Sequence, residues 1–191
     1  AEQKSMERLI LVFVIALSSS LANGEPYNFI KSSCQTTLYP NLCFRILSPY
    51  AHSVHRNKRS IAQIALNASL KRAKSAQSFA YTIAKAKGLK RLEYNAVKDC
   101  IETFADGVDR LRQSIRELAR VNPSPGNDFS FHLSNVQTWV SSALTDADTC
   151  LGGFDGADGR VRTAIRRHVY DVSKVTSVGL ALVNRFAAQL P

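Results

Sequence analysis

Four cysteines are the residues of this chain whose side chains could form covalent cross-links or hold a metal: Cys34, Cys43, Cys100 and Cys150. Zinc sites place cysteines in C-x-x-C pairs or beside clustered histidines, and neither arrangement accompanies these residues. The apolar run at residues 9–17 predicts secretion into an oxidising compartment, where an even set of cysteines forms two disulfides, for which three pairings exist. We choose Cys34 with Cys43, which closes a short local hairpin, and Cys100 with Cys150, which ties two predicted helices together.

Other side chains able to bind metals or catalyse reactions do not form a site. His52 and His55 stand three residues apart, but no carboxylate or cysteine near them completes a zinc site. His168 has no accompanying nucleophile or carboxylate, so we interpret it as a histidine at the margin of the core. Asp155 and Asp158 lack the calcium-loop pattern and are interpreted as turn residues. We predict no catalytic residue, metal or cofactor, and we expect a protein that is not an enzyme.

Four long segments repeat apolar residues at alternating steps of four and three, which is typical of helices packed nearly parallel to their neighbours. In the second segment these residues are Val97, Ile101, Phe104, Val108, Leu111, Ile115 and Leu118. In the others they are Ala62, Leu66, Ser69, Ala73, Ala76 and Ala80; Leu133, Val136, Val140, Ala143, Ala147 and Cys150; and Val161, Ile165, His168, Val172, Val175, Gly179, Leu182 and Phe186. We call each such set a seam.

Breakers at Gly88, 122–127 and 152–159 separate these four segments, and short connections imply antiparallel neighbours. No stretch alternates with a period of two, so no sheet is expected. The predicted fold is all-α: an antiparallel up-down-up-down four-helix bundle at residues 58–190. Before it, residues 25–57 are expected to form an N-terminal helical hairpin, broken at Pro40 and Pro49 and cross-linked by its two cysteines.

The first 22 residues have the pattern of a secretory signal peptide. Lys4 and Arg8 precede an apolar run at residues 9–17, which is too short to cross a bilayer, and small residues follow. We predict cleavage after Ala22, leaving a folded domain at 23–191 with no attachment to the membrane. An anchoring N-terminal helix is the alternative, and residues 1–5 could be translated upstream sequence because Met6 is the only methionine.

The formal net charge is +10, and removal of residues 1–22 leaves it unchanged. A basic secreted chain without stacking aromatics or a reader motif is better matched to an extracellular polyanion than to nucleic acid. Acidic cell-wall polysaccharide is one such partner, and a solvated basic surface is the alternative. Two helices are rich in arginine and could bind such an acidic polysaccharide directly: one holds Arg110, Arg112, Arg116 and Arg120, and the other Arg160, Arg162, Arg166 and Arg167.

The third bundle helix differs from the others because its outward side has no Lys or Arg. That side carries Ser134, Gln137, Thr138, Ser141, Ser142 and Thr145. Protein interfaces are depleted in charge at their centres, because a charge that loses water without gaining a partner is costly. We therefore take this side as the candidate partner contact, the alternative being a helix flanked by its neighbours. Trp139 lies beside the seam and is expected to pack at the bundle's edge, the alternative being an indole that anchors the partner.

Several motifs together resemble one known family. Residues 136–150 read V-Q-T-W-x-x-x-A-L-T-D-x-x-T-C, residues 34–43 read C-x-T-x-x-Y-P-x-x-C, and residues 99–102 read D-C-x-E. With the signal peptide, these are similar to the plant pectin methylesterase inhibitor domain. The resemblance implies a four-helix bundle with an N-terminal hairpin, and bridges in the pairing chosen above.

The resemblance also implies a function: one-to-one binding of plant pectin methylesterase in the cell wall, or apoplast. The inhibitor would cover the substrate cleft and block de-esterification of pectin. It implies contacts from the third bundle helix, and the residues we name there are Gln137, Ser141, Ser142, Thr145 and Asp146. Invertase inhibitors share the fold but place Pro-Lys-Phe before this helix, a motif that this chain lacks. A glycan acceptor sequence stands at Asn67.

Overall fold

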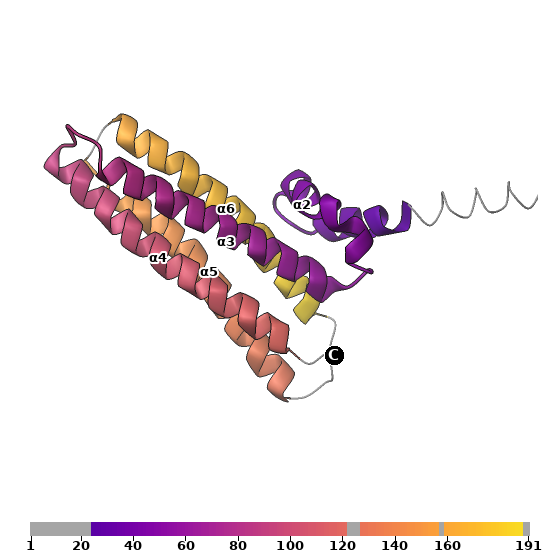
Figure 1. Ribbon diagram of the computed structural model, residues 1–191. Helices are drawn as coiled ribbons and strands as arrows, with labels where there is room; N and C mark the ends of the chain where they lie inside the picture. Colours follow the sequence, from indigo (N-terminus) through magenta and orange to yellow (C-terminus); the bar gives the residue numbers. More distant parts are fainter. Residues whose placement is uncertain (1–23, 122–126, 157–158, 189–191) are drawn as a thin grey trace, which may run out of the picture.

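The computed structural model describes residues 24–121, 127–156 and 159–188 and shows four long helices. They are α3 (Lys58–Ala84), α4 (Arg91–Arg120), α5 (Asn127–Gly152) and α6 (Arg160–Ala187). Each runs antiparallel to the next, and α6 returns to lie beside α3, so that the four form a closed bundle (Figure 1). No strand occurs in the described ranges. The predicted all-α bundle is confirmed.

The signal-peptide prediction, the breakers at 122–126 and Asp158 fall outside the described residues.

The predicted seams form the core of this bundle. All six seam residues of α3 are buried, as are all six of α5. In α4 and α6 the seam residues are buried, except for four that are half-buried: Ile101, Ile115, Val161 and His168. The period of the apolar residues therefore located the inner face of each helix.

Small seam residues bring α3 and α6 close together. Ala73, Ala76 and Ala80 are buried on α3, and Gly179 lies on the facing side of α6. A Cβ atom added at Gly179 would stand 3.1 Å from Cδ2 of Leu66, which is closer than ordinary contact. The two helix backbones therefore approach one another at a distance that a larger side chain at position 179 would increase.

Local signals fix where two of the helices begin. The side chain of Asn57 accepts a hydrogen bond of 3.1 Å from the backbone N–H of Ser60, which caps the first turn of α3. His55 and Arg56 have positive φ values of 43° and 54° and turn the chain into that helix. At the start of α4, the Glu93 carboxylate accepts a bond of 3.0 Å from the N–H of Lys90.

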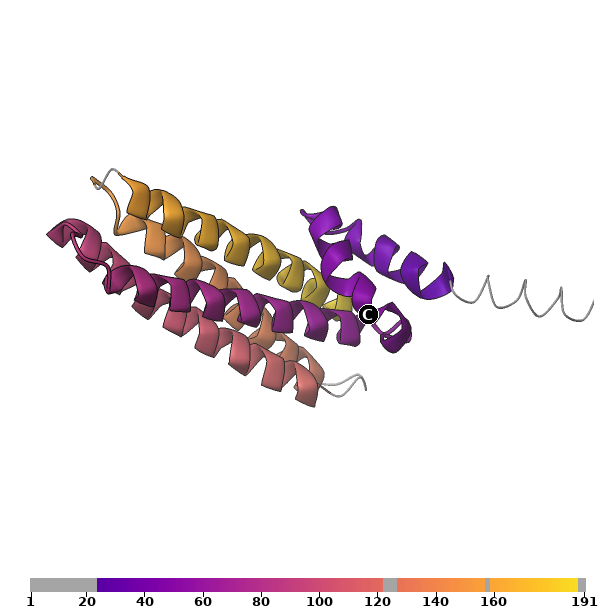
Figure 2. The ribbon, with the colours of Figure 1, turned by 45° about the horizontal axis from the view of Figure 1, so that its top comes forward.

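An N-terminal hairpin precedes the bundle. It consists of helical residues 24–34, the helix α2 (Pro40–Leu47) and the 3₁₀ helix η1 (Ser48–Ser53). Pro40 is the first residue of α2, a position that needs no N–H donor. The hairpin lies beside one end of the bundle, where α2 contacts α3 and α6 (Figure 2). The Arg185 guanidinium on α6 also donates to the backbone oxygen of Ser32 at 3.3 Å.

Two disulfides are present, in the pairing chosen from the sequence. Cys34 and Cys43 join the two arms of the hairpin, with Cα atoms 5.5 Å apart. Cys100 and Cys150 join α4 to α5, with Cα atoms 4.4 Å apart. All four cysteines are buried. In the described part of the chain no helix combines the length and the apolar character required to cross a membrane.

Candidate functional site

The outward side of α5 carries a stripe of uncharged side chains. Its exposed members follow one another at steps of three and four: Phe131, Ser134, Thr138, Ser141 and Thr145. The helix contains no Lys or Arg. Phe131 is 64% exposed and stands at the N-terminal end of the stripe. We call these five residues the α5 stripe.

Hydroxyl groups on this side of α5 are partly bound to their own helix. The Thr145 hydroxyl donates to the backbone oxygen of Ser141 at 3.4 Å, and the Thr149 hydroxyl donates to that of Thr145 at 2.8 Å. Each hydroxyl oxygen can still accept a further hydrogen bond. The stripe therefore offers acceptors and apolar contact to a partner without a charge that would have to lose its water.

Two of the predicted contact residues lie at the sides of α5, where they link it to its neighbours. Gln137 Nε2 donates to Asn184 Oδ1 on α6 at 2.8 Å. Asp146 Oδ2 accepts from Arg110 Nε on α4 at 3.1 Å. Ser142 is half-buried. Of the five residues named from the sequence, Ser141 and Thr145 face outward, and Gln137 and Asp146 help to hold the helix in place.

The Asp146 carboxyl combines burial with an ion pair. Burial raises the pKa of Asp146, and the nearby Arg110 guanidinium opposes that rise. One side of the carboxylate is thus held by α4 while the side chain keeps a small exposed fraction. A partner that approached α5 from the α4 side would meet this pair.

A second polar cluster fixes the beginning of α5. Glu117 on α4 is buried, and its Oε1 atom accepts a hydrogen bond of 2.7 Å from His132 Nδ1. Asn135 Nδ2 lies 3.4 Å from the same oxygen, and Arg120 lies 4.0 Å from the other. The hydrogen bond from His132 is the main reason that the pKa of Glu117 lies below its usual value, although burial opposes it.

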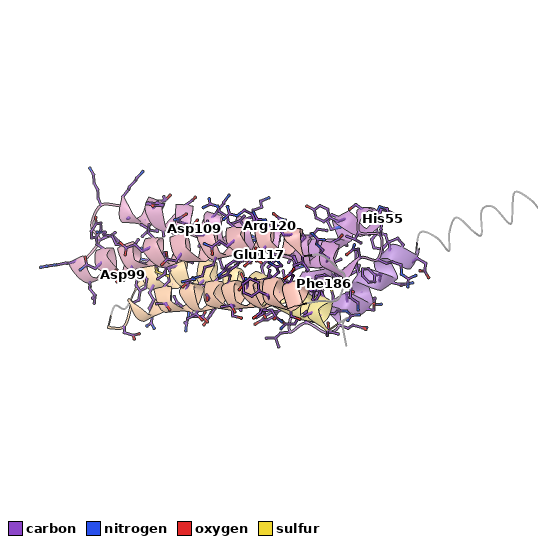
Figure 3. All side chains as sticks on the ribbon, turned by 90° about the horizontal axis from the view of Figure 1, so that it is seen from below. His55, Asp99, Asp109, Glu117, Arg120 and Phe186 are labelled. Atoms are coloured by element: carbon purple, nitrogen blue, oxygen red, sulfur yellow. A yellow bond between two sulfur atoms is a disulfide. The ribbon has the colours of Figure 1, made fainter. Side chains whose placement is uncertain are left out.

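The Glu117 cluster lies near the beginning of α5, and therefore near the N-terminal end of the α5 stripe. Figure 3 shows Glu117 and Arg120 on the half of the bundle nearer to the hairpin, far from Asp99 at the other end of α4. At the same end, Phe129 on α5 packs against Phe186 on α6, with ring centroids 5.7 Å apart. His132 and Phe129 therefore hold the first turns of α5 from two sides, and Phe131 between them projects into solvent.

Sequence reasoning missed both Phe131 and the Glu117 cluster. Phe131 lies three residues before Ser134, so the spacing of the stripe could have located it. Glu117 and His132 lie on different helices, and no spacing within one helix relates them.

Three histidines for which the sequence predicts no metal-binding or catalytic role, His52, His55 and His168, lie at the periphery of the fold. The His168 ring stacks on Phe79 with centroids 4.0 Å apart, and burial lowers the pKa of His168 while Asp171 opposes the change. His52 and His55 are exposed. Among the described residues, no group of three or more His, Cys, Asp or Glu side chains is placed to hold a metal.

Comparison with known proteins places this bundle among described families. The profile described as "Plant invertase/pectin methylesterase inhibitor" matches residues 28–182. The chain belongs to this family. The match spans most of the hairpin, both disulfides and the α5 stripe.

Individual relatives agree with this assignment. Pectinesterase inhibitor 9 of Arabidopsis thaliana is 49% identical over 187 residues, which cover 94% of this chain and 92% of the relative. The "21 kDa protein" of Daucus carota is 44% identical over 182 residues, with 94% and 92% covered. A crystal structure of a mutant pectin methylesterase inhibitor from Arabidopsis matches with a TM-score of 0.63 at 20% identity, covering 83% of this chain and 94% of that one. This structural match supports the fold.

Proposed function

We propose that this chain is a secreted inhibitor that binds plant pectin methylesterase one to one in the cell wall and occludes its active-site cleft. It would limit the de-esterification of pectin and perform no chemistry of its own. The observation that carries the proposal is the α5 stripe, an exposed surface without basic residues in a chain of net charge +10. The family membership, and relatives named as pectinesterase inhibitors, support it.

The stripe has the composition of an interface centre. A standard protein interface has an apolar, uncharged core with a polar rim, and aromatic anchors contribute most of its affinity. Phe131 would supply an anchor, and the hydroxyls of Ser141 and Thr145 would bind polar groups of the enzyme. Ser142, Gln137 and Asp146 would form the margins of the contact.

The test uses the full chain expressed in a secreting host, so that the disulfides form. The purified protein is titrated against a plant pectin methylesterase and, in parallel, a plant acid invertase, while each enzyme's activity is followed. Loss of esterase activity that saturates near one inhibitor per enzyme, with invertase unaffected, is the expected result. Loss of invertase activity alone would assign the chain to the other branch of the family.

The same preparation tests the proposed processing. Mass spectrometry of the secreted protein should show an N-terminus at Asn23, as cleavage after Ala22 requires, and would reveal any glycan at Asn67. An intact N-terminus would contradict the proposed signal peptide.

A second partner is favoured by the distribution of charge: acidic pectin itself. The basic side chains lie mainly on helices other than α5, so a polyanion could bind without covering the stripe. Binding to a polyanion should weaken steeply as salt is added, whereas an interface centred on uncharged residues should weaken only modestly. Measuring both affinities at low and at moderate salt separates the two modes.

A further inference from the structure

The charge of this molecule is strongly polarised between two pairs of helices. α3 carries five Lys and Arg side chains and no Asp or Glu, and α6 carries six with Asp171 as its only acidic residue. In α4 basic and acidic residues are equal in number, and α5 has acidic residues only. Because α3 and α6 lie side by side (Figures 1 and 2), they make one side of the bundle strongly positive.

A groove lies on this positive side, where the N-terminal hairpin meets α3 and α6. It has a volume of about 930 Å³, and Arg45 of α2 and Lys71 and Arg72 of α3 line it. Asp171 pairs with Arg72 at 3.0 Å. Arg45 and Lys71 are exposed, and neither forms a salt bridge with any residue that the structure describes. The groove thus keeps two uncompensated positive charges.

The walls of the groove suit a sugar as well as an anion. Tyr50, which is 50% exposed, lines it together with Ile46 and Ile64. Aromatic and aliphatic side chains can pack against the C–H faces of sugar rings. A neighbouring hollow shares Asp171 and adds Arg167 and Lys174, so the positive surface continues along α6 beyond the groove.

We propose that this groove binds de-esterified stretches of pectin, a chain of uronic acid sugars with one carboxylate per unit. The inference rests on the proposed function for the identity of the polymer, and on Arg45, Lys71 and the groove walls for the site. Guanidinium and ammonium groups bind carboxylates through charge-assisted hydrogen bonds, which a methyl ester cannot form at equal strength. The groove would therefore select the product of the esterase over its substrate.

The groove lies away from the α5 stripe, so polymer and enzyme could bind at the same time. α5 does not line the groove, and α3 lies diagonally across the bundle from α5 (Figure 1). An inhibitor that holds the polymer through the groove keeps its α5 stripe available to the enzyme. Product binding would then concentrate the inhibitor at sites where the esterase has already acted.

The test measures binding to the inhibitor alone, by calorimetry, of oligogalacturonates of equal length with free or methyl-esterified carboxylates. The double variant Arg45→Gln, Lys71→Gln removes the two uncompensated charges. Its matched control is Arg91→Gln, Lys98→Gln, which removes two exposed charges from α4 and changes the net charge equally. Circular dichroism checks that both variants remain folded. Esterase binding is measured separately, without polysaccharide.

We expect the free acid to bind and the ester to bind at least tenfold more weakly. The groove variant should lose about tenfold in affinity for the acid, and the control about twofold or less. Equal losses in the two variants, or no preference for the acid, would overturn the proposal. Failure to bind esterase while the groove still selects the acid would overturn the proposed function and leave the groove standing.

Discussion

Glu117 Oε1 on α4 lies 2.7 Å from His132 Nδ1 on α5, and this hydrogen bond ties the last turns of one helix to the first turns of the next. It sits one residue from Phe131, the exposed aromatic residue of the α5 stripe. A contact inside the bundle thus controls the position of a residue that we expect to touch the partner.

This contact predicts a pH-dependent stability. Because the pKa of Glu117 is lowered in the fold, its charge stabilises the folded state above the unfolded pKa of about 4.3, and that stabilisation is lost as the pH falls through the folded value. Glu117→Gln should lower the free energy of unfolding by about 1–2 kcal/mol at pH 7. The difference from the unmodified protein should shrink below about pH 4.

Urea unfolding at several pH values measures this effect. Glu102→Gln is the matched control, because Glu102 is exposed on the same helix and should change stability by less than about 0.5 kcal/mol. A deficit for Glu117→Gln that is equally large at pH 7 and pH 3 would show that the carboxylate charge is not its source.

A charge placed in the α5 stripe should weaken enzyme binding without unfolding the protein. Thr145→Arg puts a guanidinium in the proposed interface, where its desolvation would cost about 1–3 kcal/mol and so raise the dissociation constant about 5- to 150-fold. Inhibition titrations against the esterase measure this. Ser78→Arg, at an exposed position of α3, is the control and should inhibit normally; equal inhibition by both variants would move the interface away from α5.

The two disulfides should differ in their contribution to stability. The Cys100–Cys150 bridge spans 50 residues and joins two core helices, and a loop of that length predicts a contribution of about 4 kcal/mol from chain entropy. The Cys34–Cys43 bridge spans 9 residues and predicts about 3 kcal/mol, confined to the hairpin. Replacing each pair by serine and measuring urea unfolding compares them. A larger loss from the hairpin pair would contradict this ranking.

A glycan at Asn67 should compete with polysaccharide, because Asn67 lines the same groove as Arg45 and Lys71. Glycosylated protein should bind de-esterified oligogalacturonate at least several-fold more weakly than the Asn67→Gln variant from the same host. Enzymatic removal of the glycan should restore binding. Equal affinities for the glycosylated and unglycosylated forms would place the polymer elsewhere on the positive side.

The sequence predicted those features that depend on one helix at a time. The α3 seam is an example: Ala62 to Ala80 repeat at a helical period, and every predicted position is buried. Burial of that kind follows from the solvent preference of each side chain. The uncharged side of α5 was predicted for the same reason.

Features that depend on the register between helices could not be predicted. From its position along α5, Gln137 is predicted to face outward. Its side chain instead donates a hydrogen bond to Asn184, because α6 lies on that side. Glu117 meets His132 only once the two antiparallel helices are aligned. The groove likewise requires the hairpin to fold back onto α3 and α6, which no local pattern specifies.

The bridge between Cys100 and Cys150 makes a covalent ring of the intervening chain, which includes most of α4 and almost all of α5. A protease that cut the backbone once anywhere inside this ring would leave the two ends attached through sulfur, and the packed helices would still be held together. Separating them would require both a cut and a reductant. Outside the cell, where proteases are common and reducing thiols are scarce, the helix that carries the proposed contact surface would therefore survive a single cleavage as part of one molecule.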